Sequence, residues 1–263
     1  MPMAEGEIRV GTSGYSYVDW VGPFYPEGTR QSEFLAHYAR FFDICEINYT
    51  YYRMPDPQTV AAMLQKSLGG VDFTFKLHRS ITHEGDDAAA CIRRFVAGIE
   101  PALAAGKVPA ILAQFPNSFR PSREAWNRIG LLADALADVA PLVVEFRSVE
   151  WFRARFFDRL KRMGVGFCCV DEPRGEGLMP AVAIATGDVA YVRLHGRNRA
   201  KWWNHKSAEE RYDYLYSADE LEEWAAKIEE LARSAARVLV FFNNHPGGKA
   251  VRNALELKRM LGV

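Results

Sequence analysis

The stretch Leu142-Val143-Val144-Glu145-Phe146-Arg147 begins as an apolar run and ends with charged residues at alternate positions. Alternation with a period of two is typical of a β-strand, and it predicts that Glu145 and Arg147 share one face of that strand. A strand that is apolar along its length and turns polar at its end is typical of a parallel sheet, where functional side chains gather at the strand ends. The stretch therefore predicts a parallel α/β fold with chemistry at the ends of its strands.

Similar β-rich runs lie on both sides of this stretch, and most are separated by amphipathic segments. The predicted strands cover residues 8–12, 44–48, 73–78, 110–114, 142–147, 165–171, 189–195 and 238–243. The predicted helices cover residues 32–42, 57–68, 87–105, 122–139, 151–163, 218–235 and 250–261, whereas residues 172–188 are too rich in Gly and Pro for a helix. Strands that alternate with helices form right-handed βαβ units, and about eight units predict a single (β/α)8 TIM-barrel-like domain over residues 1–263.

A doubly wound open sheet is the alternative α/β fold. Its usual phosphate-binding fingerprint, G-x-G-x-x-G, is missing after the first predicted strand, where Gly11-Thr12-Ser13-Gly14-Tyr15 stands instead. We find no motif for an organic cofactor in the chain. The closed barrel is therefore the favoured prediction.

The composition is that of a globular protein without a strong overall charge. Of the 263 residues, 49% are hydrophobic, and Lys plus Arg equal Asp plus Glu at 33 each, so no overall field draws the chain to nucleic acid or to an anionic membrane. No apolar run approaches the roughly 18 residues of a membrane-spanning helix, and the N-terminus lacks the pattern of a secretory signal. We expect a cytoplasmic protein whose 4 cysteines, none in a C-x-x-C spacing, are buried thiols.

Most of the predicted strands end in polar residues, and in a barrel these ends meet at one rim. Three of the residues are the cations Lys76, Arg147 and Arg193, which together predict an anionic ligand such as a carboxylate or a phosphate. The candidates for catalysis and proton transfer are Glu145, Asp171, His195 and Lys76. The other predicted substrate contacts, besides Arg147 and Arg193, are polar or aromatic residues: Glu46, Asn48, Tyr52, Gln114, Asn243, Asn244 and Trp202.

Carboxylates and His at several strand ends are compatible with a divalent metal, but we do not favour one. The chain has no H-x-H or H-E-x-x-H spacing, and the neighbouring Lys and Arg residues would repel a cation. No metal ligand is therefore predicted.

Residues 196–206, Gly-Arg-Asn-Arg-Ala-Lys-Trp-Trp-Asn-His-Lys, interleave cations with aromatic residues. Such interleaving is typical of proteins that bind single-stranded nucleic acid. The alternative is a lid over the barrel mouth, in which Trp202 and Trp203 pack against the tyrosines of residues 212–216. The zero net charge favours the lid.

Ordered motifs run along nearly the whole chain. They include residues 11–17 (GTSGYSY), 46–55 (EINYTYYRMP), 75–76 (FK), 81–83 (ITH), 114–116 (QFP), 145–147 (EFR), 191–197 (YVRLHGR) and 242–244 (FNN). With these motifs the chain resembles the YecE-like family, known as domain of unknown function 72. The resemblance implies a TIM-barrel fold whose biochemical activity is not established. The family pattern usually places His directly after the Glu-x-Arg of strand five, where this chain has Ser148.

Three functional hypotheses follow from these residues. The leading one is a barrel enzyme that acts on a small or medium anionic substrate at the C-terminal rim by acid/base chemistry of the hydrolase type. The second is a nucleic-acid binding protein or phosphodiesterase that uses residues 196–206 to follow a phosphate backbone. The third is a non-catalytic ligand sensor. The sequence indicates no oligomeric state.

Overall fold

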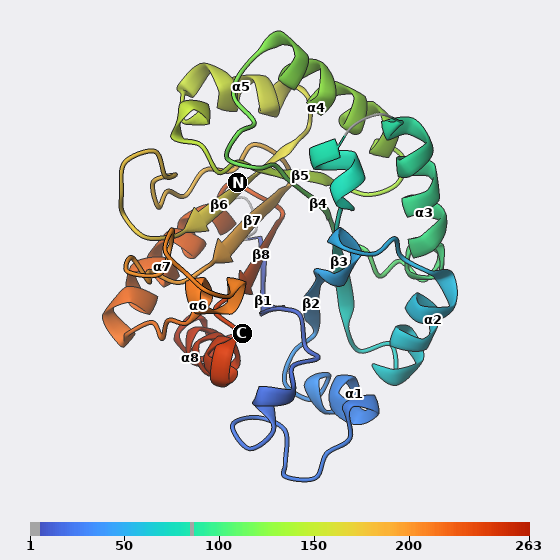
Figure 1. Ribbon diagram of the computed structural model, residues 1–263, viewed down its shortest axis with the longest axis vertical. Coiled ribbons are helices and arrows are strands. Elements are labelled where there is room, and N and C mark those ends of the chain that lie inside the picture. The colour runs from blue at the N-terminus through green and yellow to red at the C-terminus, as the bar shows by residue number, and fades with distance from the viewer. Residues whose placement is uncertain (1–5, 85–86) are drawn as a thin grey trace.

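The strands form a closed parallel barrel in chain order, in which each strand pairs with the next and β8 pairs with β1 (Figure 1). The computed structural model describes residues 6–84 and 87–263. The strands are β1 Glu7–Ser13, β2 Ile44–Ile47, β3 Asp72–Lys76, β4 Ile111–Gln114, β5 Leu142–Glu145, β6 Gly166–Asp171, β7 Val189–Leu194 and β8 Arg237–Phe242. The predicted (β/α)8 TIM-barrel-like fold is confirmed.

The helices cover the outside of this barrel (Figure 1). They are α1 Phe34–Tyr38, α2 Pro57–Lys66, α3 Ala88–Ala104, α4 Arg123–Leu136, α5 Ala154–Arg162, α6 Ala208–Tyr212, α7 Ala218–Ala232 and α8 Lys249–Leu261. Residues 172–188, between β6 and β7, form no helix, as the sequence predicts. The short helix α6 was not predicted, and it lies in the loop that follows β7.

Two predicted helices begin two or three residues later than expected because a tight turn precedes each of them. In the predicted helix 32–42, a 3₁₀ turn at Gln31–Glu33 precedes α1, and the amides of Phe41 and Phe42 both donate to the carbonyl of Tyr38, which ends it. In the predicted helix 151–163, a 3₁₀ turn at Val149–Trp151 comes first, and Ser148 Oγ accepts from the amide of Glu150 at its start. Sequence periodicity does not separate such turns from the α-helix that follows them.

The register of the strands decides which side chains enter the lumen. Residues that are paired on neighbouring strands point their side chains to the same face of the sheet. Gln114 and Glu145 therefore share a face, and Val170 shares a face with Arg193. The barrel is tight between β1 and β2, since a Cβ on Gly11 would lie 2.2 Å from the carbonyl oxygen of Ile44. Only glycine allows this close approach.

The N-terminal end of the barrel is closed by ion pairs. Arg9 Nη1 lies 2.5 Å from Asp72 Oδ2, and Arg9 Nε lies 3.0 Å from Asp43 Oδ2. Lys107 Nζ reaches the other oxygen of Asp72 at 2.9 Å. Groups at this end of a TIM barrel contribute to stability, whereas ligands bind at the opposite rim.

Two expectations from composition can be compared with the structure. In the described residues, no helix is both long enough and apolar enough to cross a membrane. Cys45, Cys168 and Cys169 are buried as predicted, but Cys91 is only half-buried because it lies beside the buried stripe of α3, which includes Ile92, Phe95 and Ile99.

Candidate functional site

A buried network of charges forms the floor of the site at the C-terminal end of the lumen. Arg193, on β7, lies between two carboxylates: Nη1 donates to Glu145 Oε2 and Nη2 donates to Glu46 Oε1, each at 2.6 Å. The hydroxyl of Tyr191 donates to the second oxygen of Glu46 at 2.7 Å. Burial opposes ionisation of Glu145, but Arg147 and Arg193 outweigh it and hold its pKa well below the usual range. The floor therefore carries an ionised Glu145 that is paired with two arginines.

Arg147 lies above this floor, just past the end of β5. Its Nε is 2.7 Å from Glu145 Oε1, and its Nη1 is 3.3 Å from Glu172 Oε2. The other oxygen of Glu172 accepts from the amide of Met179 at 2.9 Å. Burial raises the pKa of Glu172 to about 7, although Arg147 acts in the opposite direction. Near neutral pH this carboxyl can therefore donate or accept a proton.

Lys76 ends β3 and reaches into the same region. Its Nζ donates to Gln114 Oε1 at 2.7 Å and lies 4.2 Å from the ring centroid of Tyr51. No carboxylate of the described residues comes within ion-pair distance of this amine. Burial, and then the positive charges of Arg193 and Arg147, lower the pKa of Lys76 to about 7.

His195 is fully buried at the end of β7. Asn243 Nδ2 lies 3.1 Å from His195 Nδ1, so the amide donates and the imidazole accepts. The remaining nitrogen, Nε2, then carries the hydrogen and lies 3.4 Å from Glu145 Oε1. Burial and the charge of Arg147 lower the pKa of His195 to about 3, so the ring is neutral at physiological pH.

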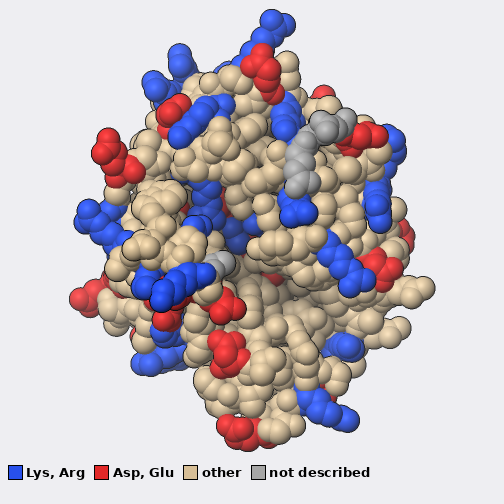
Figure 2. Space-filling view, in the orientation of Figure 1, with Lys and Arg blue, Asp and Glu red and all other residues tan. Residues whose placement is uncertain are grey.

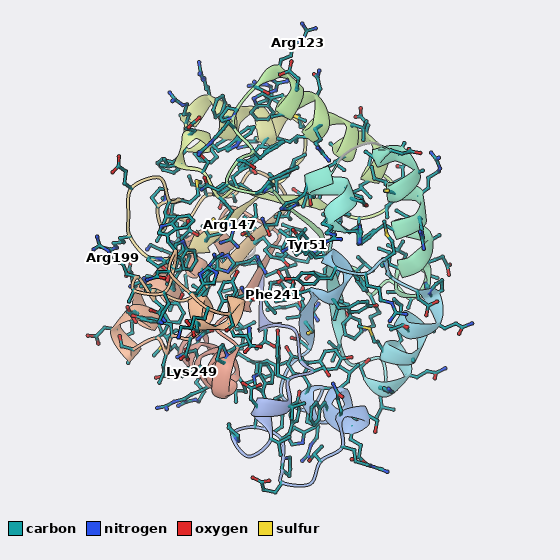
Figure 3. The ribbon with its side chains drawn as sticks, viewed as in Figure 1. Tyr51, Arg123, Arg147, Arg199, Phe241 and Lys249 are labelled. Carbon is teal, nitrogen blue, oxygen red and sulfur yellow. The ribbon has the colours of Figure 1, made fainter. Side chains whose placement is uncertain are left out.

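Two adjoining cavities open above these residues. The larger, of about 290 Å³, is lined by Tyr17, Asn48, Tyr52, Lys76, Arg147, Arg193, Glu209, Tyr212, Asn243 and His245. The smaller, of about 190 Å³, is lined by Gln114, Pro116, Asn117, Arg147, Glu172, Leu178, Trp202, Trp203, Arg211 and Tyr212. Arg147 and Tyr212 line both. Figure 2 shows Lys and Arg side chains in the central hollow, and Figure 3 shows Arg147 and Tyr51 near the centre of the ring of strands.

A wider hollow, of about 1090 Å³, lies on the outside of the barrel between α4 and α5. Its walls include Trp126, with Arg159 stacked 4.2 Å above the ring, and Met163. None of the residues predicted for the site lines it. The chemistry of the chain is gathered at the rim instead.

Two predicted site residues point away from the cavities. Asp171 lies on the outer face of β6, where Arg197 holds both of its oxygens at 2.8–3.1 Å. Asn244 donates to the carbonyl of Tyr214 at 2.8 Å and to Asn253 Oδ1 at 3.0 Å. Each is adjacent in sequence to a residue that does line a cavity, so the alternation of the strand turns it outward.

Arg193 lines the larger cavity, as predicted, but it has more ion-pair partners than the sequence suggested. Arg193 was expected to wait for an anion, but Glu46 and Glu145 already accept from it. Tyr52 lies on the edge of the larger cavity with 71% of its surface exposed. Glu172 and Arg211 were missed, and Tyr212 was expected only as a packing partner of the loop tryptophans. Glu172 lies just past the predicted end of strand six, and the other two lie in a short helix that was not predicted.

Loop residues 196–206 form part of the wall, and two of their four Lys and Arg side chains are paired with carboxylates of the protein. Arg197 contacts Asp171, Glu220 and Glu223, and Lys201 Nζ lies 3.2 Å from Glu210. Trp202 is buried with its ring edge-on to Tyr212, as a lid would require, but Trp203 is 65% exposed rather than packed. Among the described residues, Arg199 and Lys206 have no carboxylate partner, so two cations of this loop are left to contact a nucleic-acid backbone.

Among the described residues, no group of three or more His, Cys, Asp and Glu side chains is arranged to hold a metal ion. Ser148, at the position where the family pattern has His, is buried and starts the turn Val149–Trp151, with Arg120 Nη1 also donating to its hydroxyl.

Comparisons with known proteins agree with this architecture. A family model described as "Protein of unknown function DUF72" matches residues 9–263. The UPF0759 protein YunF of Bacillus subtilis (strain 168) is 28% identical over 97% of this chain and 95% of its own length. A DUF72 family protein from Thermotoga maritima MSB8 superposes with a TM-score of 0.90 and 40% identity, over 98% of this chain and 100% of that one. Another, from Enterococcus faecalis V583, gives a TM-score of 0.86 and 24% identity over 97% and 96% of the two chains. The model match and these relatives show that this chain belongs to the DUF72 family, a protein family of unknown function.

Proposed function

We propose that this protein is an enzyme that carries out acid/base chemistry of the hydrolase type on a small anionic substrate at the C-terminal rim of the barrel. One observation carries the proposal. Lys76 and Glu172, whose pKa values both lie at about 7, line the two cavities that Arg147 joins. A pair of this kind can supply both the base and the acid of a proton-transfer reaction at neutral pH.

The carboxyl of Glu172 is the proton donor in this proposal. Glu172 lines the smaller cavity, where a bound molecule would lie beside it. Because its pKa is about 7, a large fraction of the carboxyl groups is protonated near neutral pH. Glu145 has the opposite character, because it is ionised, fully buried and fixed by Arg147 and Arg193. We assign it the task of holding Arg147, while His195, neutral and hydrogen-bonded to Asn243, orients the same cluster.

An anionic substrate is favoured by the cations that the protein leaves without a carboxylate partner. Among the described residues, neither Lys76 nor Arg211 has an Asp or Glu oxygen within ion-pair distance, and both line the cavities. The Nε of Arg211 is buried without a hydrogen-bond partner. An oxyanion would supply these missing contacts, with the fork of Arg147 as a further donor.

Calorimetry with inorganic phosphate and with malonate tests the proposal directly. We expect one binding site per chain and a higher melting temperature, with an affinity roughly tenfold lower, or about 1.4 kcal/mol, in an Arg211→Met variant. Lys66→Met removes an exposed cation at the end of α2 and should leave binding unchanged. Absence of both heat and thermal shift at millimolar anion would overturn the proposal.

The same titration separates this function from the binding of nucleic acid. A ligand held in a cavity by two or three groups should show a shallow dependence on salt, whereas a protein that neutralises many backbone phosphates loses affinity steeply as salt rises. Tight binding of an oligonucleotide with a steep salt dependence, in place of phosphate binding, would favour the nucleic-acid hypothesis.

A further inference from the structure

The amine of Lys76 is held in a defined position by neutral groups. Its acceptor, Gln114 Oε1, cannot turn away, because the amide nitrogen of the same side chain donates to the carbonyl of Phe115 at 2.7 Å. The backbone is fixed as well, since Thr50 Oγ1 donates to the carbonyl of Lys76 at 2.6 Å. Lys76 lines the larger cavity.

This arrangement does not fit a structural role for the charge of Lys76. A structural lysine is normally paired with a carboxylate, whereas this one has an amide oxygen and the face of Tyr51. Burial and the charges of Arg193 and Arg147 disfavour the ammonium form, and together they outweigh the carboxylates of Glu145 and Glu46, which favour it. A large fraction of the amine is therefore neutral at physiological pH, and the neutral amine is the nucleophile.

The cavity around Lys76 contains groups that an addition to a carbonyl needs. Tyr212 and Arg147 line it, so a phenol and a guanidinium are available to polarise a carbonyl oxygen or to hold an acidic group. Asn48 lines it as well, and its Oδ1 is buried without a hydrogen-bond partner among the described residues. That oxygen can accept a hydrogen from the attacking amine or from a hydroxyl of the adduct.

We propose that Lys76 is a catalytic nucleophile that forms an imine with the carbonyl carbon of a small anionic aldehyde or 2-oxo acid. This inference rests on the proposed function for the anionic character of the substrate, and it adds the reacting group. The amine nitrogen bonds to the carbonyl carbon, and one of its hydrogens passes to the carbonyl oxygen. The carbon–oxygen bond then breaks, and the oxygen leaves as water with the second amine hydrogen.

The step is balanced without any further reactant. One amine and one carbonyl give one imine and one water molecule, and no electrons are transferred. Water later hydrolyses the imine, which returns the lysine and the carbonyl compound, so the amine is regenerated. Glu172 lines the smaller cavity, which adjoins the larger one at Arg147 and Tyr212, and its carboxyl can supply a proton for the loss of water.

Reductive trapping tests the proposal. The protein is incubated near neutral pH with pyruvate, or with glyoxylate, in the presence of sodium cyanoborohydride, and is then analysed by intact mass and peptide mapping. We expect a single adduct on Lys76 whose mass is that of the oxo acid less one oxygen atom, at a level roughly tenfold above any other lysine. An even distribution over surface lysines, or no adduct on Lys76 with either acid, would overturn the proposal.

Two variants and a control sharpen the result. Lys76→Arg keeps a nitrogen donor of similar reach, but its guanidinium stays protonated and cannot form the imine, so the adduct should be abolished. Gln114→Glu gives the amine a carboxylate partner, so trapping near neutral pH should slow and its pH dependence should move to higher pH, which a merely structural role of Gln114 would not produce. Lys66→Met should behave as the parent protein, and circular dichroism verifies that each variant is folded.

The outcome also separates this inference from the proposed function. If phosphate binds but no adduct forms, the anion site stands and the imine does not. If neither is observed, both are wrong.

Discussion

Arg193 Nη1 lies 2.6 Å from Glu145 Oε2, and the two side chains are 2% and 0% exposed. Removing one partner of a buried pair leaves the other charge uncompensated, which typically costs about 3–5 kcal/mol. In this case Arg193→Met would strip a partner from Glu46 as well. We expect the variant to lose at least about 3 kcal/mol of unfolding free energy in urea titrations at neutral pH.

Arg30→Met is the matched control for this measurement, because Arg30 also pairs with a carboxylate, that of Glu33 at 2.8 Å, but with 79% of its side chain exposed. Exposed pairs contribute about 0–1 kcal/mol. Similar small losses in both variants would mean that the floor network does not stabilise the barrel.

Glu172 should make stability depend on pH. Its folded pKa, about 7, lies above the ordinary value of 4.5, so the folded state binds more protons than the unfolded state between these pH values, and stability falls as pH rises through that window. Glu172→Gln removes the ionisation and retains an acceptor for the amide of Met179. The unfolding free energy of the variant should exceed that of the parent by an amount that grows from about pH 4.5 upward. This difference should level off above about pH 7, at about 3 kcal/mol.

Urea denaturation of both proteins at several pH values checks this prediction. A difference in stability that stays constant from pH 4.5 to pH 8 would show that the carboxyl of Glu172 is not held protonated by burial.

The sequence predicted the barrel because each strand is a short β-rich run between helical segments, and this local pattern needs no knowledge of the tertiary contacts. It also placed Lys76, Glu145 and Arg193 on the lumen face, as the alternation within their strands indicates. What it could not supply was the register between strands. A buried strand with apolar residues on both faces, such as β6, has no polar alternation to mark its lumen side.

The adjacent acids Asp171 and Glu172 show the consequence. Only one of them can face the lumen. Val170 pairs with Arg193 and faces the lumen with it, so Glu172, two positions further on, faces the lumen as well and Asp171 faces outward. The Asn243-Asn244 pair presents the same choice, and Asn243 faces inward. The thiol of Cys168 lies 4.0 Å from Glu145 and so marks the lumen face of β6. Alternation from Cys168 puts Glu172 on the same face, but the contact that marks this face exists only in the folded chain.

The two tryptophans of the loop should respond differently to truncation. Trp202 is 3% exposed and packs edge-on against Tyr212, so Trp202→Ala should destabilise by about 3–5 kcal/mol. Trp203 is 65% exposed on the wall of the smaller cavity, so Trp203→Ala should change stability by less than about 0.5 kcal/mol. Thermal denaturation of the two variants measures these changes. Equal losses of stability in both would contradict the packing described for this loop.

Arg147 tests whether the rim is built for a ligand or only for stability. Arg147→Lys keeps a positive charge beside Glu145 but lacks the planar fork, so phosphate affinity should fall roughly tenfold while stability changes by less than about 1 kcal/mol. Arg147→Met removes the charge as well, yet Glu145 keeps Arg193 at 2.6 Å, so the loss of unfolding free energy should be about 1–3 kcal/mol and smaller than in Arg193→Met. Calorimetry with phosphate and urea titration measure the two effects on the same samples. If Arg147→Met is as unstable as Arg193→Met and both Arg147 variants bind phosphate like the parent, Arg147 serves only to hold the carboxylates, and the anion site must be sought elsewhere.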